Sequence, residues 1–162
     1  MGGEALGGRR ATREEIDKTL EDLKEMGFFD CCEKYDICGS YRREKKDSGD
    51  IDILFIPNEK YNDWIADFKG DKQYGGFGDA ILLNGIQIDL FAALEDSYAC
   101  QQILWTGPPT FNIWLKGKAM RRGMFFCTRG LYYSNMKITG IKTEADVFRL
   151  LGTDFIKPSD RD

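Results

Sequence analysis

Residues 50–56 constrain the fold of this chain more than any other segment. They begin with Asp50-Ile51-Asp52 and continue as an apolar run that ends at Pro57-Asn58. Side chains alternate across a β-strand, so aspartates at positions i and i+2 point to the same face. The unbroken apolar run is typical of a central strand that is covered on both faces. The segment therefore predicts a central strand with two carboxylates on one face at its start.

Two neighbouring carboxylates are energetically favourable mainly when cations lie beside them. Their charges repel each other, and burying them without compensation is costly. Divalent cations between the carboxylates would remove both penalties. A simpler alternative stays open, in which Asp50 is a turn residue and Asp52 an isolated exposed acid.

A glycine-serine turn precedes this strand. Residues 35–38 are predicted to form a short strand that leads into Gly39-Ser40, residues 41–46 the start of a short helix, and residues 47–49 a turn. Unpaired N–H groups at a helix start bind anions. Gly39 permits close approach, Ser40 adds a hydroxyl, and Arg43 can bind the same anion through two nitrogens. A phosphate site beside metal-binding carboxylates indicates phosphoryl or nucleotidyl transfer.

A third carboxylate lies on a predicted hairpin. Asn84-Gly85 is the preferred two-residue turn between strands, here residues 80–83 and 86–91. Apolar side chains of the second strand share one face, and Asp89 lies on the other. Together with Asp50 and Asp52, Asp89 supplies the third carboxylate that a two-metal site requires.

The remaining pattern predicts two domains of mixed structure. Thr12 and Glu15 form a capping box for a helix over residues 12–26, and Thr143 caps another over 143–151. The break at 106–109 separates predicted domains 1–104 and 105–162. Further helices are predicted at 61–68, 98–105 and 111–122, further strands at 124–126 and 130–133, and a loop at 74–78.

Composition excludes several kinds of chemistry. The 162 residues include no histidine, which excludes Ser-His-Asp and Cys-His catalysis and histidine-ligated zinc. Five cysteines without a Cys-x-x-Cys pair predict free thiols in a reducing compartment. We find neither a signal sequence nor a membrane-spanning segment. We therefore expect an intracellular protein that is not secreted and has no membrane partner, of viral, phage or bacterial origin.

Charge is unevenly distributed along the chain. The net charge is −4, yet residues 106–131 contain five cations and no acid. A locally basic surface on an acidic protein can follow a phosphate backbone. An ordinary solvated helix face remains the alternative for this segment.

Two sets of motifs resemble a known family. Cys-Gly-Ser-Tyr-Arg-Arg at 38–43, followed by Ser-Gly-Asp-Ile-Asp at 48–52, is similar to the palm signature of family X DNA polymerases, the polymerase beta relatives. Residues 106–107, 111–112, 130–131, 143–148 and 158–161 resemble the thumb of that family, in the same order. The resemblance spans roughly residues 9–161. It implies an α+β fold, with a nucleotidyltransferase palm of mixed β-sheet and helices followed by a small α/β thumb.

The resemblance also implies roles for individual residues. Asp50, Asp52 and Asp89 would be catalytic and would hold two Mg²⁺ ions, with Mn²⁺ as a substitute. Residues expected to bind the nucleotide are Gly39, Ser40, Arg43 and Gly49 at its triphosphate, Trp105 and Gly107 at its sugar, and Asn112 at its base. Residues expected to bind DNA are Lys116, Lys118, Arg121 and Arg122.

The chain departs from the family pattern at several positions. Glu44 replaces the usual glycine, Gln87 an arginine, Leu104-Trp105 a tyrosine-phenylalanine pair, and Lys116 an arginine. We find no segment for the lyase domain or the helix-hairpin-helix fingers, as in small viral members of the family.

The expected function is that of a minimal DNA-directed DNA polymerase in gap-filling repair. Its partners would be primer-template or gapped DNA and a deoxynucleoside triphosphate, and a DNA ligase or other repair protein is a candidate partner. Three alternatives stay open. They are a template-independent terminal transferase, a nucleotidyltransferase for a small molecule or protein, and an inactive DNA-binding scaffold.

Overall fold

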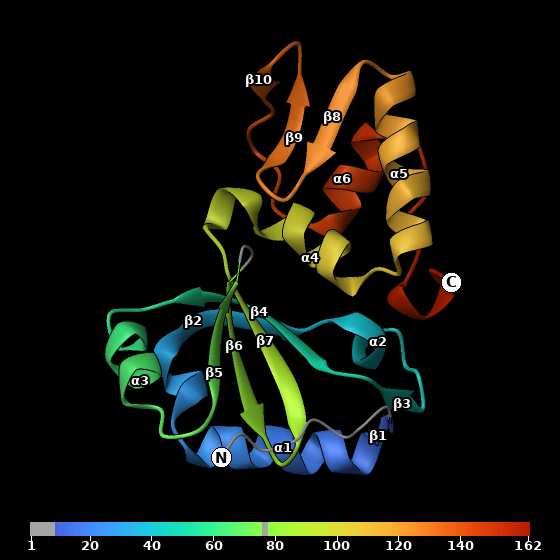
Figure 1. Cartoon of the computed structure of the whole chain (residues 1–162). Helices are drawn as coiled ribbons and strands as arrows, with labels where there is room; N and C mark the ends of the chain where they lie inside the picture. Colours follow the sequence, from blue (N-terminus) through green and yellow to red (C-terminus); the bar gives the residue numbers. More distant parts are fainter. Residues whose placement is uncertain (1–8, 76–77) are drawn as a thin grey trace.

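The computed structural model describes residues 9–75 and 78–162. They form two lobes stacked one on the other (Figure 1). The N-terminal lobe contains a five-stranded sheet in the order β2-β4-β7-β6-β5. The central strands β4 (Ile51–Pro57) and β7 (Ile86–Ala92) run parallel to each other. Strand β2 (Cys32–Ile37) pairs antiparallel with β4. On the other side, β6 (Gly78–Leu83) pairs antiparallel with β7, and β5 (Lys72–Gly75) pairs antiparallel with β6.

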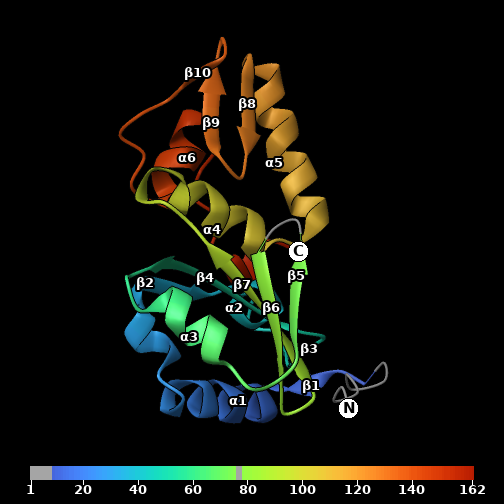
Figure 2. The same cartoon turned by 60° about the vertical axis from the view of Figure 1, so that its left-hand side comes forward.

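One face of this sheet is covered by helices α1 (Arg13–Glu25) and α3 (Tyr61–Asp67), with a 3₁₀ turn η1 (Phe28–Cys31). Figure 2 shows α1 along the lower edge of the lobe. Ile51, Ile53 and Phe55 of β4 have no exposed surface, and they pack in the cluster that includes Ile16 of α1. The predicted capping box at the start of α1 is confirmed.

The other face of the sheet packs against the second lobe. Leu54 of β4 and Phe91 of β7 form a small cluster with Cys38 and Tyr98. Tyr98 begins helix α4 (Tyr98–Thr106), which follows a 3₁₀ turn η2 (Glu95–Ser97). The prediction of a central strand buried on both faces is therefore confirmed.

The C-terminal lobe packs four further elements around α4. They are α5 (Pro109–Arg121), a three-stranded antiparallel sheet of β8 (Met124–Cys127), β9 (Gly130–Tyr133) and β10 (Met136–Lys137), α6 (Glu144–Leu150), and the 3₁₀ turn η3 (Pro158–Asp160). The capping box predicted at Thr143 is confirmed. Ala99 and Cys100 of α4 belong to the core of this lobe, so the division after residue 104 falls inside α4. That division stays a prediction.

Local structure differs from prediction at several places, and β2 begins three residues earlier than the predicted strand. Helix α2 is Gly39–Arg42 and begins two residues earlier than the predicted helix, so Gly39 and Ser40 form its first turn. The predicted turn at 47–49 contains strand β3 (Asp47–Ser48), which pairs with β1 (Ala11–Thr12). The predicted loop at 74–78 contains the end of β5 and the start of β6, and its residues 76–77 lie outside the described residues.

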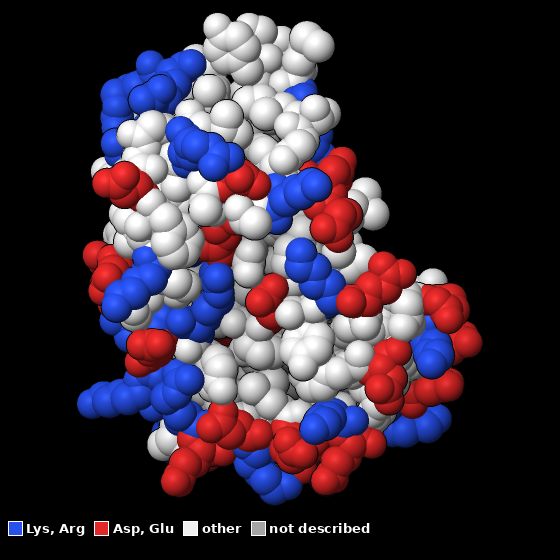
Figure 3. Space-filling view, turned by 180° about the vertical axis from the view of Figure 1, so that it is seen from behind, with Lys and Arg blue, Asp and Glu red and all other residues white. Residues whose placement is uncertain are grey.

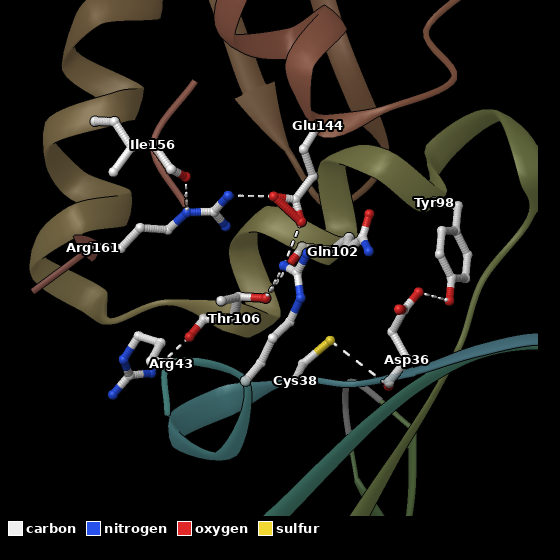
Figure 4. A network of polar contacts seen from close by, with 10 residues as sticks. Asp36, Cys38, Arg43, Tyr98, Gln102, Thr106, Glu144, Ile156 and Arg161 are labelled. Atoms are coloured by element: carbon white, nitrogen blue, oxygen red, sulfur yellow. Dashed lines mark hydrogen bonds and ion pairs between the residues drawn. The ribbon is translucent and has the colours of Figure 1, made fainter. Parts of the chain in front are cut away.

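A buried ionic network joins the lobes (Figure 4). Glu144 of α6 is 5% exposed and forms ion pairs with Arg42 of α2 and with Arg161, which has no exposed surface. Arg42 Nη1 also donates to Thr106 Oγ1 at the end of α4, over 2.8 Å. The network fixes α2, which carries the glycine-serine turn, against the C-terminal lobe.

Two further predictions concern the whole chain. The five cysteines are free, as predicted. Among the described residues, we find no helix with the length and apolar character needed to cross a bilayer.

Candidate active site

Three carboxylates meet on the sheet face that points away from α1 and α3. Asp52 of β4 and Asp89 of β7 are register partners on adjacent parallel strands, and Asp50 immediately precedes β4. One carboxylate oxygen from each of the three lies within 4.8 Å of the others. Strand alternation produces this arrangement, because the intervening Ile51, Ile53 and Ile88 point into the core on the opposite face. The donors are all hard oxygen atoms, which suits Mg²⁺.

The electrostatics of this cluster are those of a candidate cation-binding site. Burial, followed by the charges of Asp50 and Asp89, raises the pKa of Asp52 to about 8. Burial and the charge of Asp89 also raise the pKa of Asp50, and the charge of Arg10 opposes that rise. Bound divalent cations would reverse both effects, because they favour the ionised carboxylates.

Gly39 allows the backbone of α2 to lie against Asp52. Its φ of +60° favours glycine, and a Cβ built at this position would lie 2.2 Å from Asp52 Oδ2. Any larger residue would therefore displace the carboxylate. Next to it, Ser40 Oγ donates to Ser48 Oγ over 2.5 Å, which ties the first turn of α2 to β3.

Asp50 and Asp52 line a cleft of about 710 Å³ between the lobes, whereas Asp89 is not among its lining residues. Ten residues singled out from the sequence line it: Gly39, Ser40, Arg43, Gly49, Asp50, Asp52, Trp105, Gly107, Asn112 and Lys116. Phe91 lines it too, and its ring stacks on Trp105 with centroids 3.9 Å apart. The cleft thus brings together two of the three candidate metal residues with candidate nucleotide residues from both lobes.

Asn112 lines this cleft and has a buried side-chain acceptor without a hydrogen-bond partner among the described residues. Its Nδ2 donates to the Leu104 carbonyl oxygen over 2.8 Å, which fixes the orientation of the amide. Its Oδ1 is buried and has no hydrogen-bond partner. Leaving a buried acceptor unpaired costs about 1–3 kcal/mol, so this oxygen is suited to receive a hydrogen bond from a ligand.

Arg43 is placed differently from the prediction. It is the C-cap residue of α2, whereas the predicted helix over residues 41–46 would have included it. It lines the cleft, but its Nη1 donates to the Thr106 carbonyl oxygen over 2.6 Å. Its Nε lies 3.5 Å from Asp162 Oδ1 near the end of the chain. The guanidinium is therefore shared between the cleft and the C-terminal lobe.

Arg10 is a residue of the cleft that sequence reasoning missed. It lines the cleft, and its Nε lies 2.5 Å from Asp47 Oδ1. The pairing of β1 with β3 brings it there, because Ala11 is the register partner of Ser48. Two-residue strands leave almost no periodicity in a sequence. The only available signal was an arginine two residues before the predicted N-cap Thr12.

Three of the predicted DNA-binding residues lie farther along α5 and outside the cleft. Lys118 Nζ lies 5.1 Å from the centre of the Trp114 ring, and Arg122 packs where a Cβ at Gly152 would stand. Arg121 lies against Gly117 on the preceding turn. Figure 3 shows lysine and arginine side chains along one edge of the molecule, spanning both lobes, while acidic side chains gather at its base.

The departures from the family pattern have visible structural effects. Glu44 has a φ of +62°, a conformation that a glycine adopts without steric cost. Gln87 lies two residues before Asp89 on β7, and its Nε2 donates to Asp89 Oδ1 over 2.8 Å. A neutral amide thus orients the third carboxylate where the family has a cation.

A mixed sheet that carries three aspartates on adjacent strands, beside a glycine-serine turn, defines a nucleotidyltransferase palm. Comparison with protein families agrees with this class. The DNA polymerase beta palm profile matches residues 10–74, and the DNA polymerase beta thumb profile matches residues 101–162. The chain belongs to family X of the DNA polymerases and consists of a palm followed by a thumb.

The relatives differ in how much of their length this chain spans. The repair DNA polymerase X of an African swine fever virus isolate is 28% identical over 137 residues, covering 76% of this chain and 78% of the viral protein. A second isolate of that virus gives the same values. Rat DNA polymerase lambda is 27% identical over 160 residues, covering 77% of this chain but only 28% of the rat protein.

Proposed function

We propose that this protein is a minimal DNA-directed DNA polymerase that adds deoxynucleotides to a primer 3′-hydroxyl in gap-filling repair. The observation that carries the proposal is the cluster of Asp50, Asp52 and Asp89, two of which line a cleft formed by both lobes. The extent of the match to repair DNA polymerase X supports the same substrate class.

The three aspartates would hold two Mg²⁺ ions, with Mn²⁺ as a substitute. When bound, these ions would lower the pKa of the primer hydroxyl and neutralise the leaving pyrophosphate. Asp52 and Asp89 are fixed by the register of β4 and β7, and Gln87 orients Asp89 through its amide. Gly39 leaves the space that the Asp52 carboxylate occupies. These contacts pre-organise the carboxylates before any ligand binds.

The nucleotide would lie across the cleft between the lobes. Its phosphates would bind at Gly39, Ser40 and Gly49 beside Arg43, and Arg10 adds a second guanidinium at the same end. Trp105 and Gly107 would contact the sugar. The buried Asn112 Oδ1 would accept a hydrogen bond from the base, which removes its unpaired state.

DNA would follow the basic edge of the molecule. Lys116 would contact the duplex at the cleft, and Lys118, Arg121 and Arg122 would bind phosphates along α5. Each phosphate contact releases counterions, so binding of DNA should weaken steeply with salt.

A labelled gapped template separates this proposal from its alternatives. Each of the four deoxynucleotides and four ribonucleotides is supplied singly, with Mg²⁺ and with a chelator. We expect extension only with Mg²⁺ and only with the deoxynucleotide that pairs with the template base. Addition that ignores the template would instead indicate a terminal transferase. No addition on any DNA would overturn the proposal and favour a small-molecule or protein substrate, or a DNA-binding scaffold.

A further inference from the structure

Asp162, at the end of the C-terminal tail, contacts two cations of the palm. Its Oδ1 lies 3.5 Å from Arg43 Nε, and its Oδ2 forms an ion pair with Lys45 Nζ. Arg43 and Lys45 both follow α2, two residues apart. The contact with Arg43 is an ion pair without a hydrogen bond, because Arg43 Nε has no hydrogen-bond partner among the described residues. Arginine binds both carboxylate and phosphate groups, so a phosphate oxygen can take the place of the Asp162 carboxylate.

The preceding residue fixes the tail in this position. Arg161 has no exposed surface, and its Nε donates to the Ile156 carbonyl oxygen over 2.8 Å. Its guanidinium also forms an ion pair with Glu144 and lies 5.2 Å from the centre of the Phe148 ring. Figure 1 shows the chain end beside α2. The packed thumb thus places Asp162, and only its side chain is free to change partners.

The Asp162 contact is ionic and accessible to solvent. Lys45, and to a smaller extent Arg43, hold the pKa of the Asp162 carboxyl below its ordinary value, so the group is charged at neutral pH. Asp162 is 47% exposed in its side chain, whereas Arg43 is 15% exposed. Ion pairs with such an exposed partner are weak. A triphosphate, which carries more charge than one carboxylate, can replace it on Arg43.

We propose that Asp162 is an internal anion that competes with the nucleotide for Arg43 and so sets nucleotide affinity. Binding of the triphosphate releases the Arg43–Asp162 pair, and Lys45 retains the carboxylate at the edge of the site. This inference rests on the proposed function, because it needs the triphosphate to bind beside Arg43. Asp162 is a positioning residue that acts through Arg43 and touches no reacting atom.

Nucleotide affinity of the full chain tests this inference. Calorimetric titration with dATP and Mg²⁺, without DNA, measures the dissociation constant with no turnover. We expect Asp162→Asn to lower that constant about twofold to fivefold, the range that one exposed ion pair supplies. The gain should shrink at high salt because the competing pair is screened. Asp162→Glu keeps the charge and should stay close to the unmodified protein.

Asp160→Asn is the matched control. It removes the same charge from the same tail, but its carboxylate lies 3.9 Å from Lys157 and is not paired with Arg43. We expect no change in affinity for this variant. Equal effects of the two variants, or weaker binding by Asp162→Asn, would overturn the competition. If the unmodified protein bound no nucleotide, Asp162 would have no competitor and this inference would fail, whereas the proposed function would still be decided by extension of the gapped template. Binding that Asp162→Asn leaves unchanged would remove only this inference.

Discussion

Glu144 and the three aspartates of the palm differ in whether arginine side chains pair with them. Glu144 is 5% exposed and is shared by Arg42 and Arg161. Within residues 9–75 and 78–162, no lysine or arginine forms an ion pair with any of the three aspartates of the palm cluster. The pKa of Asp52 is accordingly raised to about 8, with burial as the largest cause.

The difference separates a carboxylate that joins the two lobes from carboxylates that are proposed to bind cations. A carboxylate that holds two lobes together needs permanent counterions, and the chain supplies them from α2 and the C-terminal tail. A carboxylate that binds cations must keep its lone pairs available, so the fold accepts repulsion there. The proposed function accounts for the energetic cost of the cluster, and each experiment acts on one side of this contrast.

Asp89→Asn should have the largest effect. It removes one of the three charged ligands and preserves the shape of the side chain, so we expect nucleotide addition to fall by a factor of about 1,000 or more. Single-turnover primer extension measures the rate, and urea unfolding checks that the fold is kept. Asp63→Asn on the exposed side of α3 is the control and should extend normally. Near-normal extension by Asp89→Asn would refute the two-metal assignment.

Glu144→Gln removes the charge of the acid that pairs with Arg42 and Arg161. It leaves the buried Arg161 and the part-buried Arg42 without their anion, and we expect the free energy of unfolding to fall by about 3 kcal/mol or more. Urea denaturation measures the change. Glu95→Gln removes an exposed partner 3.8 Å from Lys34 and should cost less than about 0.5 kcal/mol. Similar losses for both variants would show that the network contributes little.

The stability of the metal-free protein should depend on pH through Asp52. Its pKa is about 8 in the folded state and close to 4 in the unfolded state, so the folded protein binds more protons between these values. The free energy of unfolding should therefore fall as pH rises from about 5 to 8, by roughly 1–3 kcal/mol.

Urea unfolding in a chelator at several pH values measures this slope. Saturating Mg²⁺ should flatten it, because the cation replaces the proton. Asp52→Asn should flatten it without metal, since the titrating group is gone. A slope that persists in Asp52→Asn would assign the effect to other groups.

Gln87→Leu should give the smallest effect. It removes the hydrogen bond that orients Asp89 and leaves the carboxylates intact. A net hydrogen bond is worth about 0.5–1.5 kcal/mol, which corresponds to a rate roughly threefold to tenfold lower. Single-turnover extension at saturating nucleotide measures it, and the KM for the nucleotide should stay unchanged. An unaltered rate would mean that the strand alone orients Asp89.

Local signals predicted most of the elements that carry the site. The Asn84-Gly85 turn has φ values of +54° and +74°, as a type I′ hairpin requires, and it places Asp89 on β7 as expected. The capping boxes at Thr12 and Thr143 set two helix starts. Each of these features depends on residues no more than four positions apart, so the sequence displays them directly.

Pairing between segments far apart in the chain could not be predicted from local sequence. Strand β3 was missed because its partner β1 is far away in the chain and both have two residues. The start of α2 was misplaced because Gly39 and Ser40 have low intrinsic helix propensity, and tertiary contacts with Asp52 and Ser48 hold them there. The same long-range pairing brings Arg10 into the cleft.

The sequence by itself determined which residues could do the chemistry: Asp50, Asp52 and Asp89, the glycine-serine turn, and a basic helix without histidine anywhere in the chain. It contained no signal that Glu144, two residues from the helix-capping Asp146, is buried between two arginines. Only the tertiary structure decided which acid forms ion pairs with arginines. The reason is physical, because the energy of a charge depends on its burial and on the distance to its counterions. Those counterions come from segments far apart along the chain.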